Sequence, residues 1–234
     1  MNNVLAIFKK ELRSYFMSPV AYIVIAVFLL LCGFFFWNGF FVGGQASLSG
    51  FFHISLFFLS LLVPAITMGL LAEEKRSGTF ELLSTMPVTD VQIVVGKYLA
   101  AVALLVVALL FSLPYAITVA ALGKIDGGAT LTAYLGLLLL GSGYMAVGVL
   151  MSSLTSSQVV AFILSLVVTL ALSLVDKMLQ VLPSGIASIL EYLGAEYHYE
   201  RVARGVIDTR DLIYYASLVL LGLYFAARAL QRRF

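Results

Sequence analysis

Few side chains in this sequence have the types and spacing that covalent chemistry requires. Ser142 stands between two glycines, as some serine nucleophiles do, but no Gly-x-Ser-x-Gly elbow surrounds it and no histidine lies within its apolar run. His198 lies two residues from Glu196 and from Glu200, yet one histidine between two glutamates falls short of known metal-ligand sets. Since no nucleophile, base and orienting group converge, an enzyme is disfavoured, and helix packing is the better interpretation of Gly141 and Gly143.

The pair Gly96-Lys97 does not belong to a nucleotide-binding loop. A P-loop has a glycine five residues before its Gly-Lys pair, and Val91 stands at that position. No Gly-Lys-Ser or Gly-Lys-Thr sequence occurs elsewhere in the chain. The sequence therefore predicts no bound cofactor and no ATP-hydrolysing site on this subunit.

The composition is that of an integral membrane protein. Hydrophobic residues make up 62% of the 234-residue chain and charged residues only 11%, whereas charged residues make up about a quarter of soluble domains. A helix needs roughly 20 apolar residues to cross a hydrocarbon core about 30 Å thick. The sequence thus predicts an all-α integral membrane protein whose single membrane domain covers 1–234. Its six predicted transmembrane helices are 20–42, 53–72, 98–122, 131–151, 158–175 and 212–228.

Basic residues are divided unequally between the two sides of these spans. Nine lie on the side of the N-terminus: Lys9, Lys10, Arg13, Lys75, Arg76, Lys97, Arg228, Arg232 and Arg233. Five lie on the other side: Lys124, Lys177, Arg201, Arg204 and Arg210. The positive-inside rule therefore places both termini in the cytoplasm, as an even number of spans requires. The net charge of +2, without a single basic patch, does not indicate a nucleic-acid partner, and the single cysteine, Cys32, excludes an intramolecular disulfide.

A predicted amphipathic helix, residues 4–18, precedes the first span. Its apolar residues recur at helical spacing, while Lys9, Lys10 and Arg13 fall on the opposite side. Such a helix lies in the plane of the membrane interface, with its lysines near anionic lipid headgroups. A basic flank that only fixes the topology is a compatible, simpler interpretation.

One charged segment, 73–97, interrupts the apolar sequence. A break is expected at Ser77 and Gly78, followed by a short helix over 79–86 that ends at Pro87. Thr89 and Gln92 match a capping box, which predicts that a helix restarts there. The short helix has apolar residues in a place that water reaches, which indicates a surface for a partner. A plain loop resting on lipid headgroups is the alternative.

The same segment carries a resemblance to a known family. ABC-2 type transporter permeases have a hallmark that resembles the run Glu73-Glu74-Lys75-Arg76-Ser77-Gly78-Thr79-Phe80-Glu81-Leu82-Leu83, followed by Pro87-Val88-Thr89 and Gly96-Lys97. The amphipathic start, the six spans and the long segment between the last two spans are similar to that family as well. The resemblance covers essentially the whole chain and implies a fold like that of type V exporters.

The resemblance also implies partners and site residues. A coupling helix near 79–86 would dock on a separate ABC ATPase, which binds the ATP and Mg²⁺. Two permeases, either two copies of one chain or a pair of paralogues, would work with two ATPases. The implied ATPase-coupling residues are Glu73, Glu74, Ser77, Gly78, Thr79, Phe80, Glu81, Leu82 and Leu83.

Apart from Arg228, the last residue of the sixth span, the predicted spans contain no Asp, Glu, Lys or Arg, which argues against ion-coupled transport. Pro64 and Pro114 are expected to kink the second and third spans. In the fifth span every fourth residue is small, namely Ser157, Ala161, Ser165, Thr169 and Ser173. Such a row favours close approach of another helix, although it could instead line a polar conduit. The resemblance implies that Ser165, Thr169 and Ser173 lie at a dimer contact or translocation path.

The segment 176–211 is predicted to face outward as a pair of short helices at the membrane interface. Pro183 and Gly185 form its turn, and three tyrosines (Tyr192, Tyr197 and Tyr199) are expected at headgroup level. Asp208 to Asp211 is expected to cap the last span. Arg201 and Arg204 could meet an anionic headgroup or simply solvate a loop. This segment is similar to the branch of the family that contains the gliding-motility permease GldF.

The resemblance to ABC-2 permeases implies a permease subunit of an exporter in the bacterial inner membrane. It would act as a dimer or pseudo-dimer with an ATPase, membrane lipid and an extracytoplasmic accessory subunit as partners. The main alternative is a scaffold that transports nothing and transmits force in a mechanotransmission or gliding-motility complex.

Overall fold

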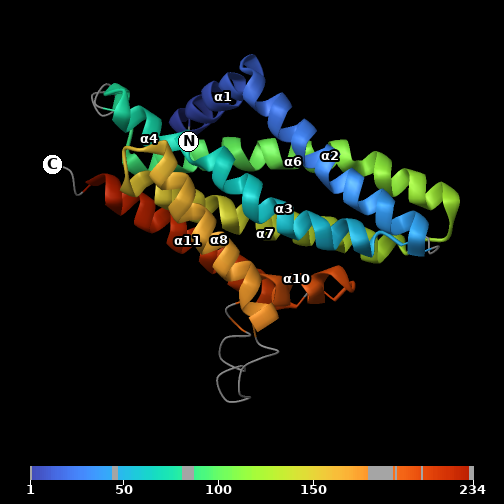
Figure 1. Cartoon of the computed structure of the whole chain (residues 1–234). Helices are drawn as coiled ribbons and strands as arrows, with labels where there is room; N and C mark the ends of the chain where they lie inside the picture. The colour runs from blue at the N-terminus through green and yellow to red at the C-terminus, as the bar shows by residue number, and fades with distance from the viewer. Residues whose placement is uncertain are drawn as a thin grey trace.

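A computed structural model of the chain describes residues 2–43, 47–80, 87–178, 192, 194–206 and 208–231 (Figure 1). All regular secondary structure in these ranges is helical. Six helical segments within them are long and apolar enough to cross a membrane. The predicted all-α fold with six transmembrane helices is therefore confirmed.

The helices correspond closely to the predicted spans. They are α1 (Asn2–Met17), α2 (Pro19–Gly43), α3 (Ser49–Thr67), α4 (Gly69–Arg76), α6 (Asp90–Leu122), α7 (Gly127–Leu154), α8 (Gln158–Met178), α10 (Ala195–Ala203) and α11 (Thr209–Gln231). Two differences matter for function. The second span is divided at Met68 into α3 and α4, and the third begins at Asp90 rather than at residue 98.

Local capping explains the early start of α6. The Thr89 hydroxyl accepts a hydrogen bond from Gln92 N at 3.3 Å, and the Gln92 side chain accepts one from Thr89 N at 3.1 Å. The predicted capping box is thus confirmed. It starts the helix at Asp90, about two turns before residue 98, where the apolar span was predicted to begin. Lys97 therefore lies inside α6 and not in a loop.

Helix α7 is the centre of the packing and contacts α3, α6, α8, α10 and α11. A Cβ atom at Gly141 would come within 2.5 Å of Leu105 Cδ2, and one at Gly143 within 2.8 Å of Leu218 Cδ2. The Ser142 hydroxyl donates to the Leu139 carbonyl of its own helix at 2.7 Å. The two glycines therefore allow close helix contact, which agrees with the packing interpretation of this motif.

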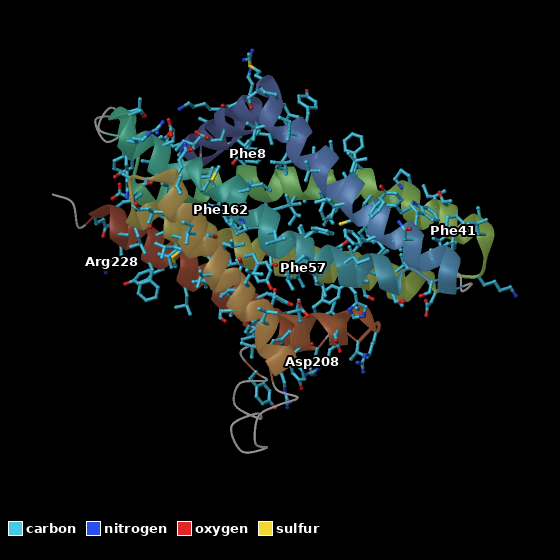
Figure 2. All side chains as sticks on the ribbon, viewed as in Figure 1. Phe8, Phe41, Phe57, Phe162, Asp208 and Arg228 are labelled. Atoms are coloured by element: carbon cyan, nitrogen blue, oxygen red, sulfur yellow. The ribbon has the colours of Figure 1, made fainter. Side chains whose placement is uncertain are left out.

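The outer surface of the bundle is apolar. Figure 2 labels Phe41 at one end of the bundle and Phe57 near its middle, and these side chains are 74% and 46% exposed. Similar large residues point outward from α6, α8 and α11. Lipid tails are as apolar as these side chains, so contacts between the helices depend on close packing and interhelical hydrogen bonds.

Helix α1 folds back from α2 at the Ser18–Pro19 junction and packs on α6 (Figure 1). Tyr15 and Phe16 pack against the core, while Lys9, Lys10 and Arg13 are exposed. The two-sided pattern predicted for 4–18 is therefore present in α1. Both ends of the described chain lie at the same end of the bundle as α4, whereas α10 lies beside the far ends of α8 and α11 (Figure 1).

Candidate coupling site

Three charged residues from separate helices meet at the α4 end of the bundle. Lys97 Nζ of α6 lies 3.1 Å from Glu11 Oε1 of α1 and 2.8 Å from Glu74 Oε1 of α4. The Lys97 side chain is 3% exposed, and each glutamate is 15% exposed. A buried charge of this kind needs partners, so this Lys97 cluster (Glu11, Glu74 and Lys97) fixes the three helices relative to one another.

A tyrosine next to the Lys97 cluster joins α1 to α3. The Tyr15 hydroxyl donates to the Ile66 carbonyl at 3.5 Å. Burial raises the pKa of the Tyr15 phenol above its ordinary value, and the nearby Glu11 carboxylate adds to this effect. Tyr15 therefore stays neutral and acts as a hydrogen-bond donor at the place where α3 approaches its end.

A serine of α7 caps the start of α4. The N-cap residue Met68 makes no side-chain cap, and the first N–H groups of a helix lack acceptors within the helix. The Ser152 hydroxyl accepts from Leu71 N at 3.1 Å and from Ala72 N at 3.0 Å, and it donates to the Met68 carbonyl at 2.9 Å. The junction between α3 and α4 is therefore held by α7.

Further polar contacts tie α4 to the helices beside it. Lys75 Nζ donates to the Ser153 carbonyl of α7, and the Gln158 side chain at the start of α8 donates to the Glu73 carboxylate. Arg76 also pairs with Glu73, with 3.2 Å between Nη2 and Oε1. Every charged residue of α4 therefore has a partner, although the helix is only 8 residues long.

Beyond α4 the chain turns at the predicted break. The Ser77 hydroxyl donates to the Glu73 carbonyl at 2.9 Å, and Gly78 has a φ of +73°, a conformation that favours glycine. Thr79 is exposed, while Phe80 is partly buried and packs against the core. Glu81, Leu82 and Leu83, predicted as coupling residues, lie outside the described residues, as does the rest of the predicted short helix.

A family model described as ABC-2 family transporter protein matches residues 36–193, about two thirds of the chain. The chain belongs to the ABC-2 family. As an ABC-2 protein it is a membrane permease of an ABC transporter, a class that associates with an ABC ATPase. The match includes α4 and the segment that follows it. No curated protein matches the chain, and similarity to the gliding-motility branch of the ABC-2 family stays a prediction.

The small-residue row of α8 is buried within this ABC-2 chain. Ser165 and Thr169 are fully buried, and Ser173 is 3% exposed, because the row packs on α3 and α7 of the same chain. Ser173 shares a hydrogen bond of 2.6 Å with the Tyr144 hydroxyl of α7. Close helix approach is therefore present within the chain, while a dimer contact or translocation path at Ser165, Thr169 and Ser173 stays a prediction.

Thr169 makes an interhelical contact that the sequence did not predict. Proline has no N–H, so Pro64 leaves the carbonyl of Ser60, four residues earlier, without its helical donor. The Thr169 hydroxyl lies 2.9 Å from that carbonyl and also 2.9 Å from the Ser165 carbonyl of its own helix, so its single proton is shared between the two acceptors. A neighbouring helix thus satisfies the backbone group that the proline frees, as the lipid environment demands.

The predicted outer segment also differs from expectation in detail. His198 does not share a site with Glu196 and Glu200: its Nδ1 lies 2.7 Å from Asp211 Oδ1 of α11, and its ring stacks on Tyr214 at 4.1 Å. In the part of the chain that the structure describes, no group of three or more His, Cys, Asp or Glu residues could hold a metal ion. His198 therefore fastens α10 to α11.

The predicted cap of the last span needs correction in part. Asp208 does cap α11, since its carboxylate accepts from Arg210 N at 3.0 Å, and this backbone bond together with Arg201 lowers the pKa of Asp208. Asp211, however, is fully buried and is not part of the cap. Tyr199 is only 2% exposed and packs on α7, so its ring is covered by protein.

Proposed function

We propose that this permease is the membrane subunit of an exporter in the bacterial inner membrane, with both termini in the cytoplasm. In this proposal a separate ATPase docks on the segment around 79–86 and supplies the energy of ATP hydrolysis. The observation that carries the proposal is the bonding of α4, the helix that leads into this segment. It has polar contacts with α6, α7 and α8 and is joined to α1 through Lys97, although it is too short to cross a membrane itself.

These contacts give a physical route for the movement. A shift of the docking segment displaces α4 through the turn at Ser77 and Gly78. Because Glu74 shares Lys97 with α1, and Ser152 holds the start of α4, the shift also reaches α6 and α7. Transport then requires two discrete arrangements of these packed helices, which ATP binding and hydrolysis favour in turn.

The test separates docking from transmission in the purified complex of the permease with its ATPase. Phe80→Ala removes an apolar anchor at the docking segment and should weaken association by about 1–4 kcal/mol, as for interface hot spots. Ser152→Ala leaves the docking segment intact but removes the group that joins α4 to α7. It should keep ATPase association and lose substrate transport. Pull-down, ATPase rate and transport into vesicles are measured together.

Matched controls exist for both variants. Phe41→Ala removes a phenylalanine at the opposite end of the bundle, and Ser153→Ala removes a hydroxyl that donates only to the Leu150 carbonyl of its own helix. Both controls should behave as the parent protein. Undiminished ATPase binding by Phe80→Ala would refute the docking site. A parent complex that hydrolyses ATP and moves no cargo would instead favour the force-transmitting scaffold.

A further inference from the structure

A pocket of 490 Å³ opens at the end of the bundle opposite α4. It lies between the start of α3, the connection from α6 to α7, and α10. Its volume falls in the range of small-molecule sites, which is about 300–1,000 Å³. Apolar groups from Leu48, Phe52, Ile125 and Ala133 share the lining with charged and polar groups. Both kinds of surface are therefore available to a single ligand.

The charged groups of the pocket leave one cation without a counter-charge. Asp126 accepts from Gly128 N and Ala129 N at 2.9 and 3.2 Å, so its carboxylate is offset by the N-terminus of α7. Glu200 pairs with Arg204 at 3.2 Å. Among the described residues, Lys124 has neither an ion pair nor a hydrogen-bond partner. The pocket therefore complements a ligand that carries one negative charge.

Two further side chains of the pocket, His53 and Tyr199, could add hydrogen bonds. His53 is exposed there and has no hydrogen-bond partner in the described part of the chain. Tyr199 also lines the pocket, and its buried hydroxyl likewise has no partner there. Arg201, for which headgroup contact and loop solvation were the two alternatives, pairs with Asp208 and Asp211.

The position of the pocket indicates where such a ligand comes from. Lys124 follows closely after the last residue of α6, at the level where this span leaves the hydrocarbon. The lipid-facing side chains just below it, Leu122 and Leu131, are each 62% exposed. A molecule in the pocket would thus have its charge at Lys124 and could extend apolar chains along this surface.

We infer that the pocket binds a membrane phospholipid through the singly charged phosphate diester of its headgroup. Lys124 neutralises the phosphate, and the first carbons of the tails lie against Phe52 and Leu48. The pocket is large enough for a headgroup but not for a whole lipid, so the remaining tail stays in the bilayer. The site would lie in the outer leaflet if the proposed orientation holds, but the binding itself does not depend on ATPase docking.

The test measures lipid binding to the purified full-length permease in detergent by native mass spectrometry. Phosphatidylglycerol should bind, while diacylglycerol with the same chains and glycerol phosphate should not, because each lacks one half of the ligand. Lys124→Ala should weaken binding of phosphatidylglycerol about fivefold, the effect expected for one basic residue near a lipid surface. Ala129→Phe, which fills the pocket, should abolish it.

The matched control is Arg210→Ala, which removes an exposed basic residue that does not line the pocket. It should bind phosphatidylglycerol as the parent does. Equal binding by the Lys124→Ala and parent proteins would overturn the inference. If glycerol phosphate binds as well as phosphatidylglycerol, the pocket is a site for soluble phosphates. If diacylglycerol binds as well, the pocket is a purely apolar groove. Either result would contradict the phospholipid site.

Discussion

At the scale of single residues, Lys97 is a buried charge at the end of the bundle that we propose to be cytoplasmic. Two carboxylates share its ammonium group, so the Lys97 cluster carries one net negative charge. Glu74 Oε2 is buried and has no hydrogen-bond partner within the described ranges. Removal of the lysine would leave two like charges close together in a place that water hardly reaches, which costs much more than loss of a surface ion pair.

Lys97→Met should therefore lower the free energy of unfolding by about 3–5 kcal/mol, as for other buried pairs that lose one partner. The measurement is denaturant unfolding in detergent. Lys9→Met, on the exposed side of α1, is the control and should change stability by less than about 0.5 kcal/mol. Adding Glu11→Gln and Glu74→Gln to Lys97→Met should restore most of the loss. A Lys97→Met protein as stable as the parent would show that the cluster is not a structural link.

At the scale of elements, α3 and α8 are joined because of a proline. Thr169 on α8 supplies the donor that Pro64 cannot give to the Ser60 carbonyl. The proline and the row of small residues are both visible in the sequence. The contact between Thr169 of this row and the carbonyl that Pro64 leaves without a donor is not. Their partnership depends on the relative rotation and register of two helices more than a hundred residues apart in the chain, which hydropathy does not determine.

Thr169→Val should destabilise the protein by about 0.6–1.7 kcal/mol, the range of interhelical hydrogen bonds in membrane proteins. The same change in a Pro64→Ala background should cost close to nothing, because the N–H of the new alanine can bond to Ser60. Unfolding in detergent gives all four corners of this double-mutant cycle. Thr118→Val, which removes a hydroxyl that donates to the Pro114 carbonyl of its own helix, is the matched control. Equal costs of Thr169→Val in both backgrounds would disprove the link.

The helices themselves could be predicted because their cause is local. Apolar runs and the Thr89 capping box determine where the spans lie and where α6 begins. Predictions failed where the cause was tertiary. Lys97 was placed in the cytoplasmic segment before the third span, and its burial is possible only because Glu11 and Glu74 arrive from two other helices. His198 was compared with its sequence neighbours, although its partner, Asp211, is on the next helix.

At the scale of the whole molecule, the positions of the two chain ends restrict the membrane topology. Both ends of the described chain and α4 lie together, while α10 is toward the other end (Figure 1). The distribution of basic residues favours the first end as cytoplasmic. The fold therefore allows two opposite orientations in the membrane, and the positive-inside rule selects one of them.

Cysteine labelling of intact cells can decide between these orientations. In a Cys32→Ala background, Val206→Cys should react with a membrane-impermeant maleimide, since Val206 is 59% exposed near α10. Ser77→Cys, exposed at the end of α4, should react only after the membrane is permeabilised. The background protein without cysteine is the control. The reverse pattern of labelling would invert the topology and place the docking segment outside the cell.

The serine cap on α4 has a consequence for biosynthesis. Ser152 lies some 80 residues downstream of the two N–H groups that it accepts from, and Thr169 lies 109 residues beyond the carbonyl that it satisfies. When the second span leaves the ribosome, neither partner has been synthesised. The span must therefore enter the membrane with polar backbone groups that await later helices, which lipid cannot satisfy. These backbone groups of the second span find their hydrogen-bond partners only after the fourth and fifth spans have inserted.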